Sequence, residues 1–461
     1  MGIRCLRVAS VATALTLAVA CYRAPQVDNS RHASAIERLV SSPPAWVDHD
    51  KLGSTLWKAE RDFYESRSNL PAWIDGDKAS PRLAALVDAL KHSEDHGLDP
   101  ARYGTDRLQQ AIAAADQNKK RYELATIPEL DTRLTYAYLC YAADLLGWSS
   151  SPRSIYTNWV PAPNKVDLGE QLKRAVLSNN VQQTLEELAP SHTQYKGLQS
   201  ALQHERQNPT GHLDQIRMNL QRWRWMPRDL GNRYVFVNVP AYQMQVVEGN
   251  TPVLAMRIVV GDPMHTTPLF NDEMTTVVFS PNWNVPESII RKEMLPRLVN
   301  DPGYLERQDI QVVGTSGQVV DSEGVDWSDE SAVAGLHFRQ EPGPKNALGL
   351  VKFQFPNPFD VYMHDTPQDA LFNKPRRALS HGCIRLEDPV ALAKYVLRDK
   401  PEWTAEKISA AMNAGHEQSV ALKEHLPVHI GYFTAWVSPD GSVTYTDDPY
   451  GLDGKQKAMQ P

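Results

Sequence analysis

The spacing of apolar residues changes once along the chain. Up to about residue 215, apolar positions recur at intervals of three and four, which predicts helices. The clearest example is residues 130–148, "LDTRLTYAYLCYAADLLGW". After Pro227 the chain turns to short alternating or β-branched runs, such as "NRYVFVNVP" and "PVLAMRIVVG", which predict strands. The pattern therefore predicts an α+β protein, with an all-α domain over residues 46–215 and a mostly β domain over residues 216–461.

Capping and turn residues predict several element ends. Ser80 is a predicted helix cap, Pro81 stands at the first helical position, and Gly97 stops the helix. Near the C-terminus, "VHIGYFTAWVSPDGSVTYTDD" predicts a β-hairpin with Pro-Asp-Gly at residues 439–441 as its turn.

A long insertion, residues 287–346, interrupts the predicted strands. It opens with the helix-like "ESIIRKEMLPRLVND" and continues with polar, glycine-containing sequence. Such a long insertion between strands is more often a lid or a binding flap than a neutral loop. The alternative is a surface loop that takes no part in binding or catalysis.

The first residues predict an export signal over residues 1–20. Arg4 and Arg7 form a positive region, and Val8–Ala20 is an uncharged apolar run too short for an ordinary bilayer span. Residues 21–45 are polar and contain prolines, which predicts a tether.

Two cleavages fit this signal. Signal peptidase I could cleave after Ala18-Val19-Ala20, whereas a lipoprotein peptidase would make Cys21 the acylated first residue. The second site resembles a lipobox but has Ala18 where that pattern prefers leucine. A lipidated Cys21 followed by Tyr22 rather than aspartate would favour the outer membrane. Both cleavages predict a periplasmic protein, and only the second gives it a membrane contact, through the lipid anchor on Cys21.

Composition and cysteine content narrow the class of protein. A chain of 461 residues is too long for one core, and 42% hydrophobic and 22% charged residues are ordinary for a globular protein. The net charge of -7 is spread along the chain, so nucleic acid is not an expected partner. Cys5 leaves with the signal, Cys140 falls in the helix of residues 130–148, and the spacing from Cys140 to Cys383 suggests no disulfide framework.

The remaining cysteine, Cys383, lies in "VYMHDTPQDALFNKPRRALSHGCIRLEDP", residues 361–389. It could bind a metal together with His364 and His381, but no CxxC or HExxH spacing accompanies them. It could be an inert buried cysteine, but Gly382 and Arg385 beside it indicate a polar turn.

The third alternative is a nucleophile. A free thiol has a pKa of about 8.5, so it needs a base or a nearby positive charge. His364 and His381 can accept the proton, and Arg385 supplies a cation. A helix capped by Asp388 would point its positive end toward the sulfur, and backbone N–H groups at Gly382 could form an oxyanion hole. These residue types together indicate acyl transfer through a thioester.

The spacing also resembles a known family. His364, a spacer from Asp365 to Leu379, and "SHGCIR" resemble the signature of the bacterial L,D-transpeptidases. "NLQRWRWMP", "PNWNVP", "RQEPGPKNALGLVKFQFPN" and "HGLDPARY" resemble the large subgroup that carries a helical scaffold domain. Members often carry a peptidoglycan-binding repeat, but here only "HERQNPTGHLDQIRMN" stands in its place. Independent anchoring to the wall is therefore not expected, and a membrane anchor on Cys21 becomes more useful.

The resemblance implies a reaction on peptidoglycan stem peptides. Cys383 would attack the carbonyl of the third stem residue, meso-diaminopimelate, expel D-alanine and form a thioester. The side-chain amine of a second stem would then form the cross-link. His364 would be the base, oriented by a backbone carbonyl of the following turn, and His381 would shape the pocket.

The family implies further roles. Arg385 would fix the loop or pair with a substrate carboxylate, and Tyr362, Ser380 and Asn357 would bind substrate. The insertion over residues 287–346 would cap the site. Neither a metal nor an organic cofactor is implied, and carbapenem-type β-lactams are expected inhibitors.

Two other functions remain open from the sequence. An L,D-carboxypeptidase or an enzyme that attaches a lipoprotein lysine would use the same thioester, because acceptor choice depends on cleft shape. A non-catalytic wall-associated lipoprotein is the alternative of another class. The intact set of His364, His381, Gly382, Cys383 and Arg385 argues against it.

Overall fold

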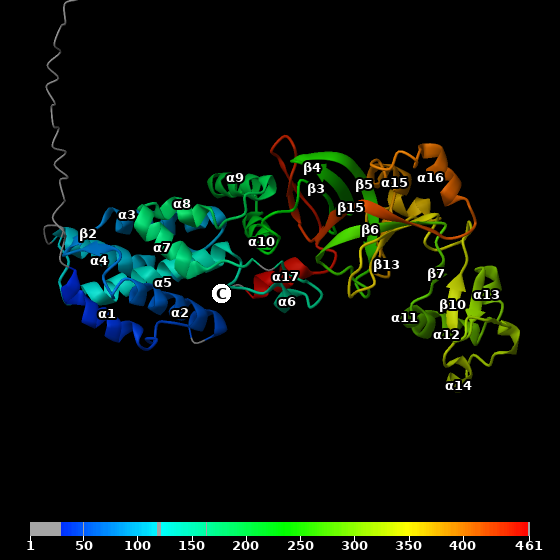
Figure 1. Ribbon diagram of the computed structural model, residues 1–461, viewed down its shortest axis with the longest axis horizontal. Helices are drawn as coiled ribbons and strands as arrows, with labels where there is room; N and C mark the ends of the chain where they lie inside the picture. The colour runs from blue at the N-terminus through cyan, green and yellow to red at the C-terminus, as the bar shows by residue number, and fades with distance from the viewer. Residues whose placement is uncertain (1–28, 49, 118–120, 163, 460–461) are drawn as a thin grey trace, which may run out of the picture.

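The computed structural model describes residues 29–48, 50–117, 121–162 and 164–459. The predicted signal and Cys21 lie outside the described residues. Figure 1 shows helices at one end, a large sheet in the middle and the segment labelled α11 to α14 at the far end. Among the described helices, none is long and apolar enough to cross a membrane.

The helical half is arranged around one central helix. α5 (Ile127–Leu145) is buried along nearly its whole length and packs against α1, α2, α3 and α7. The other elements of this half are η1 (Ser30–His32), α1 (Ala33–Val40), α2 (Lys51–Ser66), β1 (Ile74–Asp75), β2 (Lys78–Ala79), α3 (Pro81–Lys91), η2 (His92–His96), η3 (Pro100–Tyr103), α4 (Thr105–Gln117), α6 (Pro152–Ile155), α7 (Leu168–Ser178), α8 (Val181–Glu186), α9 (Thr193–Gln207) and α10 (Leu213–Arg224).

The cap at Ser80 and the stop at Gly97 are confirmed, but part of the predicted tether is a packed helix. The Ser80 side chain caps α3 by accepting the N–H of Leu83, and Gly97 ends the following 3-10 turn with a φ of 73°. The tether predicted over residues 21–45 includes α1, whose Ile36 and Val40 are buried against α2 and α5. The apolar face of α1 needs that cover, so this segment belongs to the helical core.

The β half is one nine-stranded sheet of order β13-β5-β14-β12-β11-β6-β15-β3-β4. β4 also pairs with β5, so the sheet closes on itself. α15 (Pro389–Val396) and α16 (Ala405–Met412) bury apolar residues in its core. The strands are β3 (Arg233–Asn238), β4 (Gln243–Glu248), β5 (Thr251–Gly261), β6 (Asn271–Phe279), β11 (Val351–Gln354), β12 (Met363–His364), β13 (Ala378–Ser380), β14 (Ile384–Leu386) and β15 (Gln418–Gly431).

The predicted C-terminal hairpin is shorter than expected. β16 (Ala435–Val437) and β17 (Val443–Tyr445) pair across the turn at residues 438–442. The preceding "VHIG" belongs instead to β15, which pairs with β3 and β6. The sequence prediction therefore merged the end of a central strand with a separate hairpin.

The insertion is a folded subdomain, at the far end in Figure 1. It has its own four-stranded sheet, of order β7-β10-β8-β9, and its own apolar core around Leu298, Phe338 and Trp327. Its elements are β7 (Trp283–Asn284), α11 (Glu287–Ile289), the π-helix η4 (Ile290–Met294), α12 (Leu295–Leu298), α13 (Tyr304–Arg307), β8 (Ile310–Val313), β9 (Val319–Val320), η5 (Ser322–Gly324), α14 (Glu330–Val333) and β10 (His337–Gln340).

The helical half and the sheet share a continuous apolar core. Trp223 of α10 packs against Phe236 of β3 and against Phe433, with ring centroids 5.8 Å and 4.6 Å away. The predicted boundary between residues 215 and 216 falls inside α10, because that helix belongs to both halves. The two halves are therefore joined by packing as well as by the chain.

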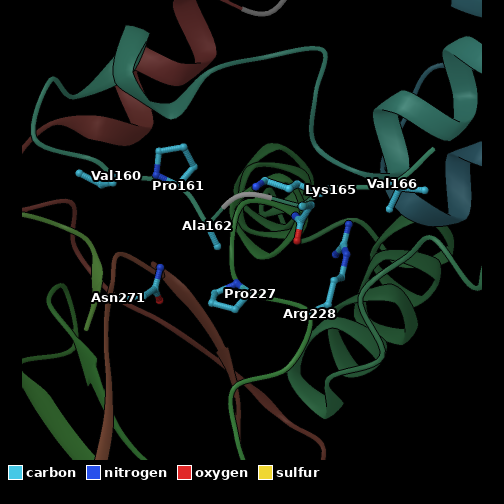
Figure 2. Close-up of a pocket in the computed structure, with 9 residues that line it drawn as sticks. Val160, Pro161, Ala162, Lys165, Val166, Pro227, Arg228 and Asn271 are labelled. Carbon is cyan, nitrogen blue, oxygen red and sulfur yellow. The ribbon is translucent and has the colours of Figure 1, made fainter. Parts of the chain in front are cut away.

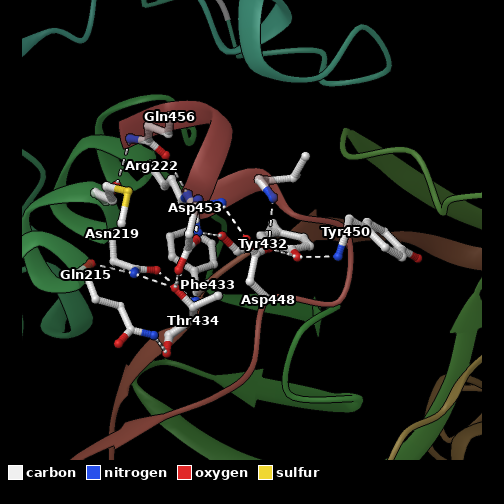
Figure 3. A network of polar contacts seen from close by, with 12 residues as sticks. Gln215, Asn219, Arg222, Tyr432, Phe433, Thr434, Asp448, Tyr450, Asp453 and Gln456 are labelled. Carbon is white, nitrogen blue, oxygen red and sulfur yellow. Dashed lines mark hydrogen bonds and ion pairs between the residues drawn. The ribbon is translucent and has the colours of Figure 1, made fainter. Parts of the chain in front are cut away.

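A polar network strengthens this junction (Figure 3). Arg222 of α10 is fully buried, and its Nη2 lies 2.6 Å from Oδ1 of Asp453 in α17 (Leu452–Ala458). Its Nε donates to Gln456 Oε1 at 2.9 Å, and Asn219 of the same helix accepts the N–H of Thr434. The network fixes α17 and the end of β15 against the helical half.

Candidate active site

Two short parallel strands assemble the site. β12 pairs with β14, with Met363 opposite Ile384 and His364 opposite Arg385. Side chains alternate between the faces of a strand, and Met363 and Ile384 face the apolar core. His364, Arg385 and Cys383 therefore share the opposite face. The pairing joins the two halves of the sequence signature.

Cys383 is half-buried, with Sγ 3.9 Å from the backbone oxygen of Asp360. Tyr362 donates to the sulfur from its backbone N–H and its hydroxyl. Burial raises the pKa of the Cys383 thiol, while these hydrogen bonds and the charges of Arg385 and Lys352 act in the opposite direction. The thiol therefore stays protonated at neutral pH, and its reaction requires a base.

His364 has the properties of that base. It is buried, and its Nδ1 donates to the backbone oxygen of Asp365 at 2.5 Å, the carbonyl of the following turn. Burial, with a contribution from Arg385, lowers the pKa of His364 to about 3. Its imidazole is therefore neutral at physiological pH, and Nε2 is available to accept a proton.

Lys352 is a cation that the sequence analysis missed. It lies on β11 directly opposite His364, and its Nζ is 5.2 Å from the ring centroid of Tyr362. Burial lowers its pKa, and its charge favours the Cys383 thiolate. Its alternation with apolar residues in "LVKFQF" indicated the strand but not the site, because the local pattern does not show which strand lies opposite or in which register.

The Gly382 turn differs from the predicted oxyanion hole. Gly382 has a φ of 114°, and its N–H donates to Ser380 Oγ at 3.1 Å. Ser380 Oγ in turn donates to the Cys383 backbone oxygen at 2.6 Å. In this structure the turn itself uses the Gly382 N–H, and buried Ser380 stabilises the turn. The oxyanion-hole role of the Gly382 turn and substrate binding by Ser380 stay predictions. The donor beside the sulfur is the hydroxyl of Tyr362.

Thr267 holds this turn from behind, and nothing in the sequence pointed to it. Its Oγ1 donates to the Gly382 backbone oxygen at 2.8 Å and accepts the Gly261 N–H at 2.9 Å. Its own N–H donates to the hydroxyl of Tyr450 at 3.1 Å, and that hydroxyl donates to the Gly261 oxygen at 2.7 Å. Through Tyr450 the junction network reaches the cysteine loop.

His381 lies against the insertion rather than the sulfur. Its Nε2 is 2.5 Å from Oε1 of Glu293, and its ring centroid is 4.9 Å from that of His265. Glu293 belongs to the π-helix of the insertion. His381 therefore connects the cysteine loop to the insertion, and its place in the reaction stays a prediction.

Two other predicted site residues have structural partners. The Asn357 amide donates to the oxygens of Phe355 and Val361, and its oxygen accepts the N–H of Phe359. Asn357 therefore shapes the preceding loop, and its contact with substrate stays a prediction.

Arg385 Nη1 donates to Gln368 Oε1 at 2.8 Å, which fixes the segment between His364 and Cys383. Its Nε is buried without a partner in the described structure. The predicted pairing of Arg385 with a substrate carboxylate stays a prediction.

The helix cap predicted at Asp388 is present, but the predicted effect of that helix on the sulfur is not. Asp388 does cap α15 by accepting the Ala391 N–H at 2.9 Å. The extended residues of β14 separate that helix from Cys383, so its dipole does not act on the sulfur. Cys140 and Cys383 are both free, and burial raises the pKa of the Cys140 thiol.

Comparison with known families identifies both halves. Residues 232–409 match the model of the L,D-transpeptidase catalytic domain, and residues 58–202 match the model of the scaffold domain. The chain therefore belongs to the L,D-transpeptidase family. Within that family it carries a helical scaffold domain ahead of the catalytic domain.

Individual relatives extend the comparison. A protein of Haemophilus influenzae named "Putative L,D-transpeptidase" is 34% identical over 238 residues, which are 52% of this chain and 48% of that relative. An L,D-transpeptidase structure from Mycobacterium smegmatis is 14% identical, covers 43% of this chain and 58% of its own, and has a TM-score of 0.20. L,D-transpeptidase 3 from Mycobacterium tuberculosis, solved with a faropenem-derived adduct, is 14% identical. The match covers 43% of this chain and 60% of that one, with a TM-score of 0.20. The family assignment rests on the domain models, not on these structural scores.

Proposed function

We propose that this protein cross-links peptidoglycan by joining the third-position diaminopimelate residues of two stem peptides through a thioester on Cys383. The observation that carries the proposal is a neutral, buried His364, oriented by the Asp365 carbonyl, on the same sheet face as Cys383. A nucleophile beside a neutral base is the arrangement that acyl transfer needs.

In the first step, Cys383 Sγ attacks the carbonyl of the third stem residue while His364 Nε2 takes the thiol proton. The oxygen of the tetrahedral intermediate becomes negative, and the Tyr362 hydroxyl donates to it. His364 then returns the proton to the leaving amine of D-alanine. The products are a thioester and free D-alanine.

In the second step, the side-chain amine of another stem attacks the thioester. His364 takes a proton from the amine and returns it to the departing sulfur, so the free thiol is regenerated. The folded insertion that contacts His381 supports an amine acceptor over water, because a covered site limits hydrolysis.

We also propose a periplasmic location, with Cys21 as a lipid attachment point to the outer membrane. The support is the signal-like N-terminal sequence. Incorporation of a labelled fatty acid that is lost in Cys21→Ala supports the anchor. A Cys21 protein that incorporates no label is inconsistent with it.

The test of the main proposal uses purified protein and its Cys383→Ala variant with disaccharide tetrapeptide. Mass spectrometry should find dimers with a tripeptide donor, formed only by the protein that retains Cys383. Unchanged substrate in both samples would contradict the proposal. Hydrolysed tripeptide without dimers would identify a carboxypeptidase, and transfer only to a lipoprotein lysine would identify an anchoring enzyme. A carbapenem should add its mass to Cys383 and block turnover.

A further inference from the structure

Lys352 is a cation of the active site that the proposed reaction leaves without a partner. Its side chain is half-buried, and within the described structure it forms no hydrogen bond and no ion pair. Its ammonium is not enclosed by protein, so it is accessible from the site. Its Nζ lies 5.2 Å from the centroid of the Tyr362 ring, and the hydroxyl of Tyr362 reaches the nucleophilic sulfur. An accessible, uncompensated cation beside a nucleophile favours the binding of an anion.

The carboxylates around Lys352 are engaged elsewhere. The charge of Glu417 raises the pKa of Lys352 against the effect of burial, but Glu417 Oε2 accepts the backbone N–H of Asn282 at 2.8 Å. Asp365 accepts a backbone N–H group with each of its two carboxylate oxygens. Within the described part of the chain, the protein therefore supplies no carboxylate that pairs with Lys352.

Arg228 is another cation with unpaired donors, and it differs from Lys352 in access. It lines the cavity of about 540 Å³ in Figure 2, where the helical half meets the sheet. Its Nη2 donates to the backbone oxygen of Leu145 at 2.8 Å, whereas its Nε and Nη1 have no hydrogen-bond partner among the described residues. These two nitrogen atoms are enclosed by protein, so a ligand in the cavity does not reach them. Of the two cations, Lys352 is the one that can meet an anion.

The register of three neighbouring strands places Lys352 in line with the reacting groups. On β11 it lies opposite His364 of β12, and His364 lies opposite Arg385 of β14. Residues directly opposite each other on neighbouring strands project from the same face of the sheet. Cys383 precedes Arg385 by two positions and shares that face. From one strand to the next, the site therefore runs from Cys383 through His364 to Lys352.

The proposed reaction sets the direction of the substrate over this row. The donor carbonyl bonds to Cys383, and the leaving amine of D-alanine receives its proton from His364. The rest of the donor stem occupies the acyl side, where Arg385 lies, so the carboxylate of D-alanine extends past His364. One carbon joins this carboxylate to the amine, and the next strand is only about 4.8 Å away, within reach of the long side chain of Lys352.

We propose that Lys352 binds the carboxylate of the terminal D-alanine and so selects donor stems that end in a free carboxylate at their fourth residue. The inference rests on the proposed function for the identity of the leaving group. The ion pair holds the leaving amine over His364. A donor whose fourth residue is amidated, or extended by a further residue, places an uncharged amide at Lys352 and loses this ion pair.

The test compares two donors on the same protein sample. One donor is disaccharide tetrapeptide with a free terminal carboxylate, and the other carries a terminal carboxamide. Release of D-alanine or of D-alaninamide gives kcat/KM for each donor, and the ratio of the two values cancels any loss of folding or of thiol reactivity. We expect a preference of about tenfold or more for the free carboxylate, because the amide loses a charge-assisted hydrogen bond.

Three variants assign this preference to one side chain. Lys352→Gln should use both donors equally well, whereas Lys352→Arg keeps the charge and should retain the preference. Lys423→Gln, at an exposed lysine of β15, is the matched control and should behave as the unaltered protein. Equal donor preference in Lys352→Gln and Lys423→Gln would overturn the inference, and so would an unaltered protein that uses both donors equally.

Formation of dimers from the free donor is measured in the same samples. Dimers together with an unchanged donor preference in Lys352→Gln would refute the role of Lys352 and leave the proposed function standing. Release of D-alanine without dimers, with the preference lost in Lys352→Gln, would support Lys352 and refute cross-linking. An unaltered protein that releases D-alanine from neither donor would overturn the proposed function and this inference with it.

Discussion

At the scale of single residues, the site combines an uncharged nucleophile with an uncharged base. Burial raises the pKa of Cys383 and lowers that of His364, so the thiol and the imidazole are both neutral near pH 7. A preformed thiolate–imidazolium pair is therefore not the resting state. Proton transfer accompanies attack on the substrate instead.

This arrangement predicts an unusual pH profile. His364 must be neutral to act, and its pKa of about 3 means that it is protonated only in strong acid. Activity should therefore persist as pH falls through 6.5, the ordinary histidine range, and decline through protonation of His364 only as pH falls below about 4. The measurement is kcat/KM against pH between 4 and 8, with circular dichroism as a control for unfolding. An acid limb centred near 6.5 would contradict the assignment.

Tyr362 offers a second test at this scale. If its hydroxyl stabilises the oxyanion, Tyr362→Phe should lower kcat by about 10²-fold with little change in KM. Tyr304→Phe, which changes a tyrosine of α13 in the insertion, is the control and should leave kcat unaltered. Equal kcat values for the two variants would remove Tyr362 from the mechanism.

At the scale of elements, turns and caps were predictable because their signals are local. Ser80, Asp388 and the Pro-Asp-Gly turn act through bonds to residues only a few positions away. β15 was largely missed, because "ALKEHLP" breaks the alternation where its pairing with β6 shifts register between Ala421 and Leu426. Such a shift depends on the partner strand, which a local pattern does not contain.

The Gly382 turn depends on Thr267. Thr267→Val should lower kcat about tenfold and cost about 1–3 kcal/mol of stability, because the Gly261 N–H and the Gly382 oxygen lose a buried partner. Thr267→Ser keeps the hydroxyl and should restore both properties. Turnover assays and thermal melts measure the two effects. A Val variant that loses stability but not kcat would limit Thr267 to a structural role.

The insertion is joined to the cysteine loop by the contact of Glu293 with His381. Both side chains are more than a third exposed, so the pair adds only about 0–1 kcal/mol to folding stability. Glu293→Gln should therefore raise KM several-fold while Tm stays constant. Glu306→Gln, also on the insertion, is the control of equal charge change. Unchanged KM in Glu293→Gln would show that the contact does not position the insertion over substrate.

At the scale of the whole molecule, the scaffold and catalytic halves share one apolar cluster and a polar network. The apolar cluster of the helical half includes Phe236 of β3 and Phe433, which follows β15. The buried ion pair of Arg222 and Asp453 connects α10 to α17 beside it. The scaffold is therefore part of the structure that holds the cysteine loop.

A variant without the Arg222–Asp453 ion pair measures how much that contact between α10 and α17 stabilises the protein. Arg222→Met should lower stability by about 3–5 kcal/mol, because it leaves the Asp453 carboxylate without its partner. The double variant Arg222→Met with Asp453→Leu should recover part of the loss. Lys457→Gln removes an exposed pair with Asp214 between the same two helices and should change little. Denaturant titration provides the values, and equal losses in Arg222→Met and Lys457→Gln would contradict the prediction.

The sequence by itself determined the order of helical and β segments, the caps and turns, and the signature of His364 and Cys383, since each depends on neighbours in the chain. The parallel pairing of β12 with β14 was decided only by the tertiary structure. That pairing brought Tyr362 and His364 to the cysteine loop, and the pairing of β11 with β12 added Lys352. Packing against the insertion turned His381 toward Glu293. These contacts join residues far apart in the chain, and their geometry follows from how the sheet closes and what covers it.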